Sequence, residues 1–293
     1  MPFVLTLIAA PDFVDLSGFV TTIKQRLANT QEPVWLHPGQ AVDLPLAEND
    51  FAAVEELLRG QAIDYAFQTS DARRRKLLIA DMDSTMIGQE CIDELAAEVG
   101  LKEKVSAITA AAMRGEIEFE PALRERVALL KGLPESVVDE VIQNRITLTP
   151  GGTALVATMK QHGAYTALVS GGFTAFTSRV ASRIGFDENR ANILNVEEGL
   201  LTGTVQEPIL GRQAKTEALE QITARLGTTP QQAIAVGDGA NDLGMIRLAG
   251  LGVAIHAKPA VSAEADVRIE HNDLSALLYL QGYAREEWVT EAG

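Results

Sequence analysis

Residues 77–86 read LLIADMDSTM, and this stretch contains the pattern from which the fold can be predicted. Four apolar residues in a row are typical of a strand that helices cover on both faces, as in a parallel sheet. The run ends at Asp81 and Asp83, and alternating positions of an extended chain place both carboxylates on the same side. Two carboxylates this close together require a compensating cation. The stretch therefore predicts a buried parallel strand with an anionic site at its carboxyl end.

Further apolar runs follow downstream and alternate with segments of helical spacing. They are YTALVSG at 165–171, AIAVGDG at 233–239, LGVAIHA at 251–257 and ADVRIE at 265–270. Strands that alternate with helices predict an α/β fold with a Rossmann-like parallel sheet. Proteins of this class bind ligands beyond the carboxyl ends of the strands.

A long insertion separates the first two of these strands, at about residues 87–150. Helical periodicity is present in CIDELAAEVG, VSAITAAAM, PALRERVALL and ESVVDEVIQ. A segment of this length is too long for a simple crossover loop. We expect a helical cap above the carboxyl ends of the strands.

The first 72 residues have a different pattern. Strands are expected at 3–9, 33–36, 41–46 and 63–68, and helices at 15–28 and 50–59. This βαββαβ order predicts a small ferredoxin-like, ACT-like α+β domain over residues 1–72, followed by a second domain over 73–293. The basic segment SDARRRK at 70–76 is expected to be a solvated linker. We expect the first domain to serve packing or homodimer formation, with binding of a regulatory amino acid as the alternative.

The composition restricts the class of partner. Against 25 Lys and Arg, the chain has 40 Asp and Glu and a formal net charge of -15, so most of its surface should repel nucleic acid. A small anionic substrate would need a metal ion and a few cations to neutralise it locally. The single cysteine, Cys91, fits a reducing compartment, and we expect a cytoplasmic protein. No stretch approaches the roughly 18 apolar residues of a membrane span.

Two later strand ends supply groups that suit a metal and a phosphate. The segment GDGAND at 237–242 provides Asp238, Asn241 and Asp242, and such oxygen ligands suit Mg²⁺. In VSGG at 169–172, the Ser170 hydroxyl and the Gly171 N–H form a plausible phosphate cradle. Lys215 stands near the start of a helical segment and could reach the same phosphate as a point charge.

Taken together and in this order, the four motifs resemble those of the haloacid dehalogenase superfamily of phosphohydrolases. The Ser-Thr pair after Asp83 is similar to the phosphoserine phosphatase branch. The resemblance implies a Mg²⁺-dependent hydrolysis of O-phosphoserine to serine and phosphate, the last step of serine biosynthesis. Asp81 would be the nucleophile that forms an aspartyl-phosphate, and Asp83 the general acid and base. Asp81, the Asp83 carbonyl and Asp238 would bind the metal, and Asp242 would orient a metal-bound water or Lys215.

The cap segment strengthens the resemblance. Glu90 and FEPALRERV at 119–127 look like the cap motifs of phosphoserine phosphatases. They imply that Glu90 faces the substrate ammonium, Arg126 faces its carboxylate and Phe119 closes over the ligand. A zwitterion needs one fixed anion and one fixed cation. Ser170, Gly171, Lys215 and Asn241 would hold the phosphate.

Several alternatives remain open at this point. The same chemistry could act on phosphohomoserine, phosphoethanolamine or a sugar phosphate, or could transfer the phosphoryl group to an alcohol. The chain could instead be chiefly an amino-acid sensor through its first domain. Its four histidines show no metal-binding spacing, so we interpret them as surface or core residues.

Overall fold

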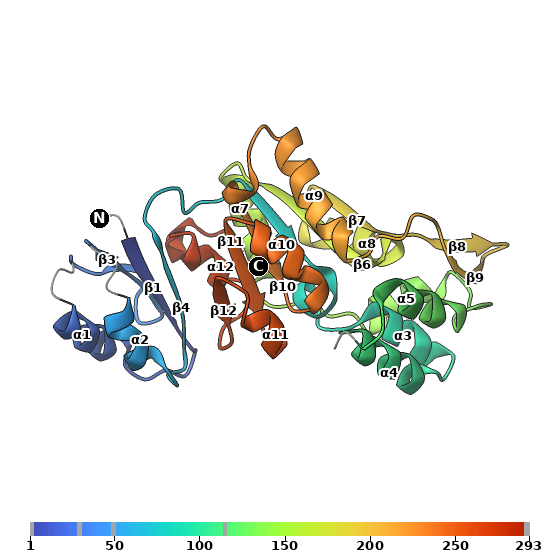
Figure 1. Ribbon diagram of the computed structural model, residues 1–293, viewed down its shortest axis with the longest axis horizontal. Coiled ribbons are helices and arrows are strands. Elements are labelled where there is room, and N and C mark those ends of the chain that lie inside the picture. The colour runs from blue at the N-terminus through green and yellow to red at the C-terminus, as the bar shows by residue number, and fades with distance from the viewer. Residues whose placement is uncertain (1–2, 28–30, 48–50, 114–115, 290–293) are drawn as a thin grey trace.

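The computed structural model describes residues 3–27, 31–47, 51–113 and 116–289. Figure 1 shows a small sheet near the N-terminus at one end, a larger sheet in the middle and a group of helices, α3 to α5, at the other end. Within the described ranges, no helix is both long enough and apolar enough to cross a membrane.

The N-terminal unit has the predicted ferredoxin-like arrangement. Its elements are β1 Phe3–Ala9, α1 Leu16–Arg26, β2 Val34–His37, β3 Ala41–Leu46, α2 Ala52–Leu58 and β4 Ile63–Thr69. The strands form an antiparallel sheet in the order β2-β3-β1-β4. The ends that we predicted for the two helices at residues 28 and 50 lie outside the described residues.

Both faces of this sheet are covered. Leu5, Leu7 and Leu44 pack with the apolar residues of α1 and α2. On the opposite face, Ile8 and Ala66 belong to the large core of the second unit. The face that a ferredoxin-like sheet leaves free of its own helices is therefore occupied by the rest of the same chain.

The second unit has the predicted Rossmann-like parallel sheet. Its strands are β5 Leu77–Ala80, β6 Tyr165–Phe173, β7 Glu188–Asn192, β10 Ala233–Gly237, β11 Leu251–Ile255 and β12 Val267–Ile269, in the order β12-β11-β10-β5-β6-β7. We did not predict β7, because its sequence ENRAN lacks an apolar run. It lies at the sheet edge and is only partly buried, so a polar sequence is accommodated there.

Alternate residues of β5 point to opposite helical layers. Leu77 and Ile79 pack with residues of α9 and α10, whereas Leu78 and Ala80 pack with residues of α7, α8 and α12. The helices of this unit are α7 Gly152–Gln161, α8 Thr174–Ile184, α9 Arg212–Arg225, α10 Leu243–Leu248, α11 Pro259–Ser262 and α12 Ala276–Leu280. This two-sided burial explains why β5 is apolar at every position.

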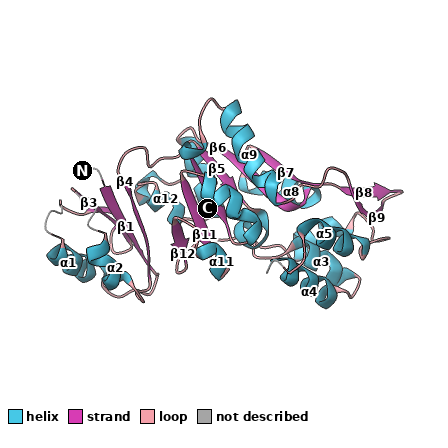
Figure 2. Ribbon diagram, viewed as in Figure 1, coloured by secondary structure: helices cyan, strands magenta, loops and turns pink. Residues whose placement is uncertain are grey.

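The cap contains the four predicted helices, α3 Cys91–Glu98, α4 Lys102–Met113, α5 Phe119–Ala128 and α6 Val137–Asn144. The chain enters and leaves it side by side, because Ile87 pairs with Leu148. A hairpin that we did not predict, β8 Leu194–Glu197 with β9 Leu200–Val205, packs against it (Figure 2). The Gly132 N–H donates to the Leu201 carbonyl at 2.8 Å. The cap is thus built from two separate parts of the chain.

The arginine segment between the two sheets is not the solvated linker that we expected. Arg73 donates to Asp43 at 2.6 Å, and only 11% of its side chain is exposed. Arg74 bonds Glu287, and Arg75 bonds the Gln231 carbonyl at 2.8 Å. Arg73 also donates to the Tyr279 carbonyl at 3.2 Å, so it joins the N-terminal sheet to the second unit, whereas the bonds of Arg74 and Arg75 are to the second unit alone. The division into domains at residue 72 stays a prediction.

Candidate active site

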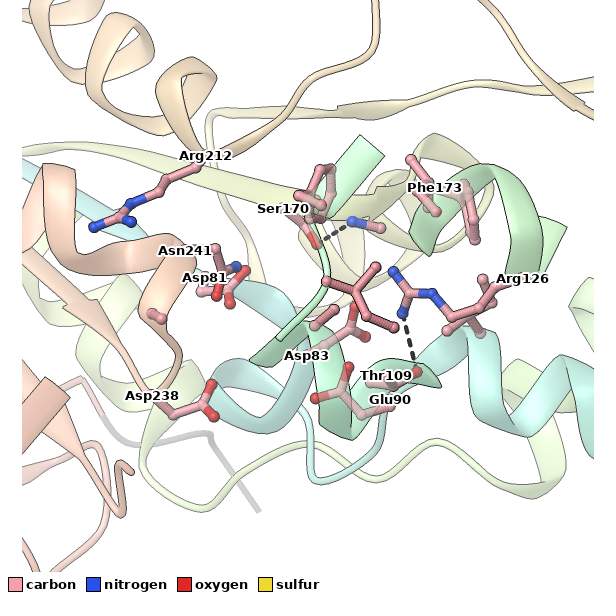
Figure 3. A pocket seen from close by; sticks show the side chains of 18 of the residues that line it. Asp81, Asp83, Glu90, Thr109, Arg126, Ser170, Phe173, Arg212, Asp238 and Asn241 are labelled. Atoms are coloured by element: carbon pink, nitrogen blue, oxygen red, sulfur yellow. Dashed lines mark hydrogen bonds between the residues drawn. The ribbon is translucent and has the colours of Figure 1, made fainter. Parts of the chain in front are cut away.

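The predicted site residues gather at one edge of the parallel sheet, where the neighbouring strands β5, β6 and β10 end. A cavity of about 300 Å³ lies between this edge and the cap (Figure 3). Its lining includes Asp81, Asp83, Glu90, Phe119, Arg126, Ser170, Gly171, Asp238 and Asn241. Lys215 is buried behind Asp81 and contacts it. The structure therefore brings together every residue that the sequence analysis assigned to the site.

Asp81 lies directly after β5 and is 4% exposed. Its Oδ1 accepts a hydrogen bond from the Met82 N–H at 2.7 Å and lies 2.6 Å from Lys215 Nζ. Within the described part of the chain, its Oδ2 has no hydrogen-bond partner. One oxygen is therefore held in place while the other remains available for chemistry.

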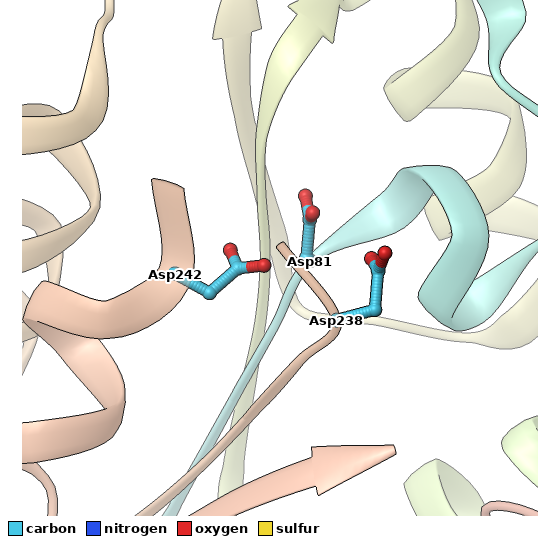
Figure 4. Close-up of side chains that lie close together, drawn as sticks. All are labelled: Asp81, Asp238 and Asp242. Carbon is cyan, nitrogen blue, oxygen red and sulfur yellow. The ribbon is translucent and has the colours of Figure 1, made fainter. Parts of the chain in front are cut away.

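Three carboxylates form a compact cluster around this point (Figure 4). Oxygens of Asp81, Asp238 and Asp242 lie within 4.8 Å of one another, and all three residues are buried. Burial and the Asp242 carboxylate raise the pKa of Asp81 well above its usual value, which Lys215 opposes. Burial and repulsion at this distance would protonate a carboxylate unless a cation were bound. Buried carboxylate oxygens are the ligands of hard divalent cations, so this cluster can hold a metal ion.

Lysines neutralise part of the cluster. Lys215 Nζ lies 2.5 Å from Asp242 Oδ1, which is the contact that we expected between these residues. Although burial opposes it, the carboxylates of Asp242 and Asp81 raise the pKa of Lys215, so this side chain stays charged. Lys258 Nζ lies 3.5 Å from Asp238 Oδ2, and the Thr85 hydroxyl donates to Asp238 Oδ1 at 3.1 Å.

The Asp83 carboxylate does not belong to the cluster of Asp81, Asp238 and Asp242. Its Oδ1 accepts from the Cys91 N–H at 3.1 Å, at the start of the cap. Burial raises the pKa of Asp83 to about 6. The next residue, Ser84, has a φ of 56°, in the left-handed region that residues other than glycine seldom adopt. The chain turns directly after Asp81, in η1 Met82–Met86, and does not continue as an extended strand, so the two aspartate side chains do not lie on the same side as we predicted: Asp81 faces the cluster and Asp83 the cap.

The last residues of β6 approach the site through two glycines, Gly171 and Gly172. The Gly172 N–H donates to Ser170 Oγ at 2.9 Å. A Cβ at Gly172 would lie 2.9 Å from Asp83 Oδ2, and one at Gly171 would lie 3.0 Å from Phe119 Cζ. A side chain at Gly172 would therefore clash with Asp83, and one at Gly171 would clash with Phe119 of the cap.

The cap supplies a carboxylate and a guanidinium to the same cavity. Glu90 Oε1 accepts from the Ser84 hydroxyl at 2.7 Å. Burial and the nearby Asp83 carboxylate raise the pKa of Glu90 to about 8. Arg126 is 7% exposed and donates to Thr109 Oγ1 at 3.0 Å. The other arginine of the motif, Arg124, is half exposed and pairs with Glu207, outside this cavity.

Three polar residues that line the cavity, Thr109, Glu118 and Arg212, were missed by the sequence analysis. Thr109 lies in the apolar helix α4, where nothing in the sequence marks it as part of a site. Arg212 stands at the start of α9, three residues before Lys215, and its charge next to a glycine was the only available signal.

Comparison with known proteins identifies the family. Residues 78–247 match the haloacid dehalogenase-like hydrolases. The chain belongs to this family. A phosphoserine phosphatase of Albidiferax ferrireducens, one such hydrolase, is 52% identical over 210 residues, which cover 70% of this chain and 89% of the relative.

Solved structures of haloacid dehalogenase-like hydrolases agree with this. A phosphoserine phosphatase carrying a phospho-aspartyl intermediate analogue superposes with a TM-score of 0.66 at 43% identity, covering 70% of this chain and 97% of that one. A probable phosphoserine phosphatase from Vibrio cholerae covers 98% of this chain and 88% of its own, with a TM-score of 0.75 at 28% identity. The second match also includes the N-terminal unit.

Proposed function

We propose that this chain hydrolyses O-phosphoserine to serine and phosphate through an aspartyl-phosphate on Asp81. One observation carries the proposal: a single small cavity joins the buried aspartates to Glu90 and Arg126. A substrate that spans it would place its phosphate at the strand ends and its ammonium and carboxylate against the cap. The phosphoserine phosphatases described above support the same substrate.

In the first step, Asp81 Oδ2 attacks phosphorus and the bond from phosphorus to the serine oxygen breaks. Lys215 and the Met82 N–H hold Oδ1, which orients the attacking oxygen. The departing serine oxygen takes a proton from Asp83. This carboxyl can hold a proton near neutral pH because burial raises its pKa to about 6. In the second step, Asp83 takes a proton from water, which attacks phosphorus and releases Asp81.

Charge on the phosphoryl oxygens needs compensation in both steps. The Ser170 hydroxyl, the Gly171 N–H and Asn241 line the cavity and would donate to these oxygens, together with Lys215. Asp81, Asp238 and the Asp83 carbonyl would hold Mg²⁺, with Asp242 orienting a water ligand or Lys215. When bound, the ion neutralises the carboxylates and withdraws charge from the phosphate.

The proposal also covers the metabolic role, the location and the assembly of the enzyme. Its reaction would complete the synthesis of serine in the cytoplasm. A homodimer through the N-terminal unit stays a prediction of the sequence. Because the sheet face away from α1 and α2 packs on the chain's own catalytic unit, such a dimer would use the helices or a strand edge.

Phosphate release from phosphoserine, phosphoethanolamine and glucose 6-phosphate, each with and without Mg²⁺, tests the substrate. We expect phosphoserine to be preferred and turnover to require the metal. Arg126→Ala should abolish the preference for phosphoserine over phosphoethanolamine, whereas the control Arg124→Ala on the exposed face of α5 should keep it. A wild-type enzyme that favours substrates lacking the carboxylate would refute this function.

Trapping of the intermediate tests the nucleophile separately. A fluoroberyllate adduct should form on the wild-type enzyme and not on Asp81→Asn, which should also lose turnover while its thermal unfolding stays close to wild type. Turnover that survives in Asp81→Asn would exclude covalent catalysis by this residue.

A further inference from the structure

A carboxyl group and a guanidinium share the cavity without pairing. Glu90 and Arg126 both line it, yet no ion pair joins them among the residues that the structure describes. In a site shielded from water, a carboxylate and a guanidinium attract each other strongly. If they paired, neither would be free for a substrate. Something in the cap must therefore hold them apart.

The cap holds Arg126 through two of its nitrogens. Nε donates to the Ala122 carbonyl at 3.1 Å. Nη1 donates to Thr109 Oγ1 at 3.0 Å, the bond drawn as a dashed line from Arg126 in Figure 3. Since Thr109 Oγ1 accepts from the arginine, its own proton must point elsewhere. Asp93 Oδ1, at 3.0 Å, and the Val105 carbonyl, at 3.1 Å, are its two acceptors.

Asp93 is a buried carboxylate that the catalytic proposal does not use. It is 9% exposed and lies outside the cavity lining. Its Oδ2 accepts from the Ser106 hydroxyl at 2.5 Å and its Oδ1 from Thr109. Burial lowers the pKa of the Arg126 guanidinium, and the carboxylates of Glu90 and Asp93 oppose this fall, with Glu90 acting more strongly. One carboxylate on α3 thus links α4 to the arginine on α5.

Glu90 has a separate anchor on the other side of the cavity. The Ser84 hydroxyl, in the turn after Asp83, donates to it at 2.7 Å. Each of the two groups is therefore held by a hydroxyl of its own. The hydroxyl that holds Glu90 is that of Ser84, in the turn after Asp83, and the hydroxyl that holds Arg126 is that of Thr109, in the cap helix α4.

We propose that Thr109, backed by Asp93, is a positioning residue that sets the specificity for the amino-acid part of the substrate. It fixes the guanidinium of Arg126 against the cap, keeps its remaining N–H groups directed at the substrate carboxylate and prevents it from pairing with Glu90. The inference rests on the proposed function, because it assigns Arg126 to a carboxylate. It adds two residues, Thr109 and Asp93, that act through Arg126.

The test compares kcat and KM for phosphoserine and phosphoethanolamine in Thr109→Val, a change that keeps the side-chain shape and removes the hydroxyl. A hydrogen bond to a charged group contributes about 1.5 to 3 kcal/mol, so we expect KM for phosphoserine to rise at least about tenfold. Because ground-state binding is lost, kcat should change much less. The preference for phosphoserine over phosphoethanolamine should fall by a similar factor. Thr109→Ser, which restores the hydroxyl, should recover it.

Two further variants separate positioning from stability. Asp93→Asn keeps the shape of the side chain and removes its charge, so it should lower the preference for phosphoserine over phosphoethanolamine, as Thr109→Val does. Ser106→Ala removes a hydrogen bond to the same carboxylate on the side away from Thr109, and it should lower the thermal midpoint without altering the preference. If both Thr109→Val and Asp93→Asn keep the wild-type preference for phosphoserine over phosphoethanolamine, the inference is overturned. A wild-type enzyme without the preference would instead refute the proposed function itself.

Discussion

Asp64 on β4 is a buried carboxylate at the contact between the N-terminal sheet and the second unit, and it is 3% exposed. It accepts from three consecutive backbone N–H groups after β12: Glu270 at 2.8 Å, His271 at 3.2 Å and Asn272 at 3.0 Å. The side-chain amide of Asn272 adds a fourth hydrogen bond at 2.9 Å. The Asp64→Ala substitution would leave four donors without an acceptor.

The size of the effect follows from these four donors. A buried donor left without a partner costs about 1 to 3 kcal/mol. The hydrogen bonds of Glu270 and His271 are only partly buried, so we use the lower value for each donor and expect a loss of about 4 kcal/mol in the free energy of unfolding. Domains are typically stable by about 5 to 15 kcal/mol, so this loss would remove a large part of the total.

Urea unfolding followed by tryptophan fluorescence measures this loss, because Trp35 reports on the N-terminal sheet and Trp288 on the region around α12. Trp288 lies 4.7 Å from the Tyr279 ring, which makes its emission sensitive to the packing of that helix. Asp71→Ala, at an exposed position in the connecting segment, is the matched control. A difference below about 1 kcal/mol between the two variants would refute the reasoning from unsatisfied donors.

Three further outcomes are expected. Burial raises the pKa of Asp83 to about 6 and that of Glu90 to about 8, and the proposed reaction needs Asp83 protonated and Glu90 charged, so kcat/KM for phosphoserine should be level between these two values and fall about tenfold per pH unit below the lower and above the higher; a steep fall between them would contradict this. Gly171→Ala would place a Cβ 3.0 Å from Phe119 Cζ, so KM for phosphoserine should rise severalfold, and an unchanged KM would exclude this crowding. Mg²⁺ should raise the thermal midpoint of the wild type by binding the folded state, and Asp238→Asn should lose most of this gain; equal gains in both would argue against the carboxylate cluster as the metal site.

Most residues of the candidate site could be predicted because they lie in short motifs at the ends of apolar strands. Asp81 follows an apolar strand, Ser170 follows the next one, and Asp238 and Asn241 follow a third. Parallel strands place their carboxyl ends on one edge, so the order of the motifs already predicts that these residues meet. The spacing of apolar residues along the chain predicted the strands and helices of the N-terminal unit, since successive residues of its strands face the core and the opposite side in turn.

The structure added what depends on contacts between distant segments. The polar strand β7 has no apolar run, and the hairpin β8–β9 is recognisable only because it packs on the cap. The basic segment at 73–75 has the composition of a solvated linker, yet Arg73 is buried against Asp43. A charged residue is buried wherever tertiary structure supplies its partner, and its neighbours in the sequence do not reveal that partner.

The same distinction applies within the site. The sequence by itself determined which side chains are available for the proposed phosphoryl transfer, because the strand-end motifs carry them. Only the tertiary structure decided how Arg126 is held, since its contact with Thr109 joins α5 to α4 and depends on Asp93 from α3. Reactive groups follow from residue types at strand ends, whereas their orientation follows from hydrogen bonds across helices whose packing no local pattern records.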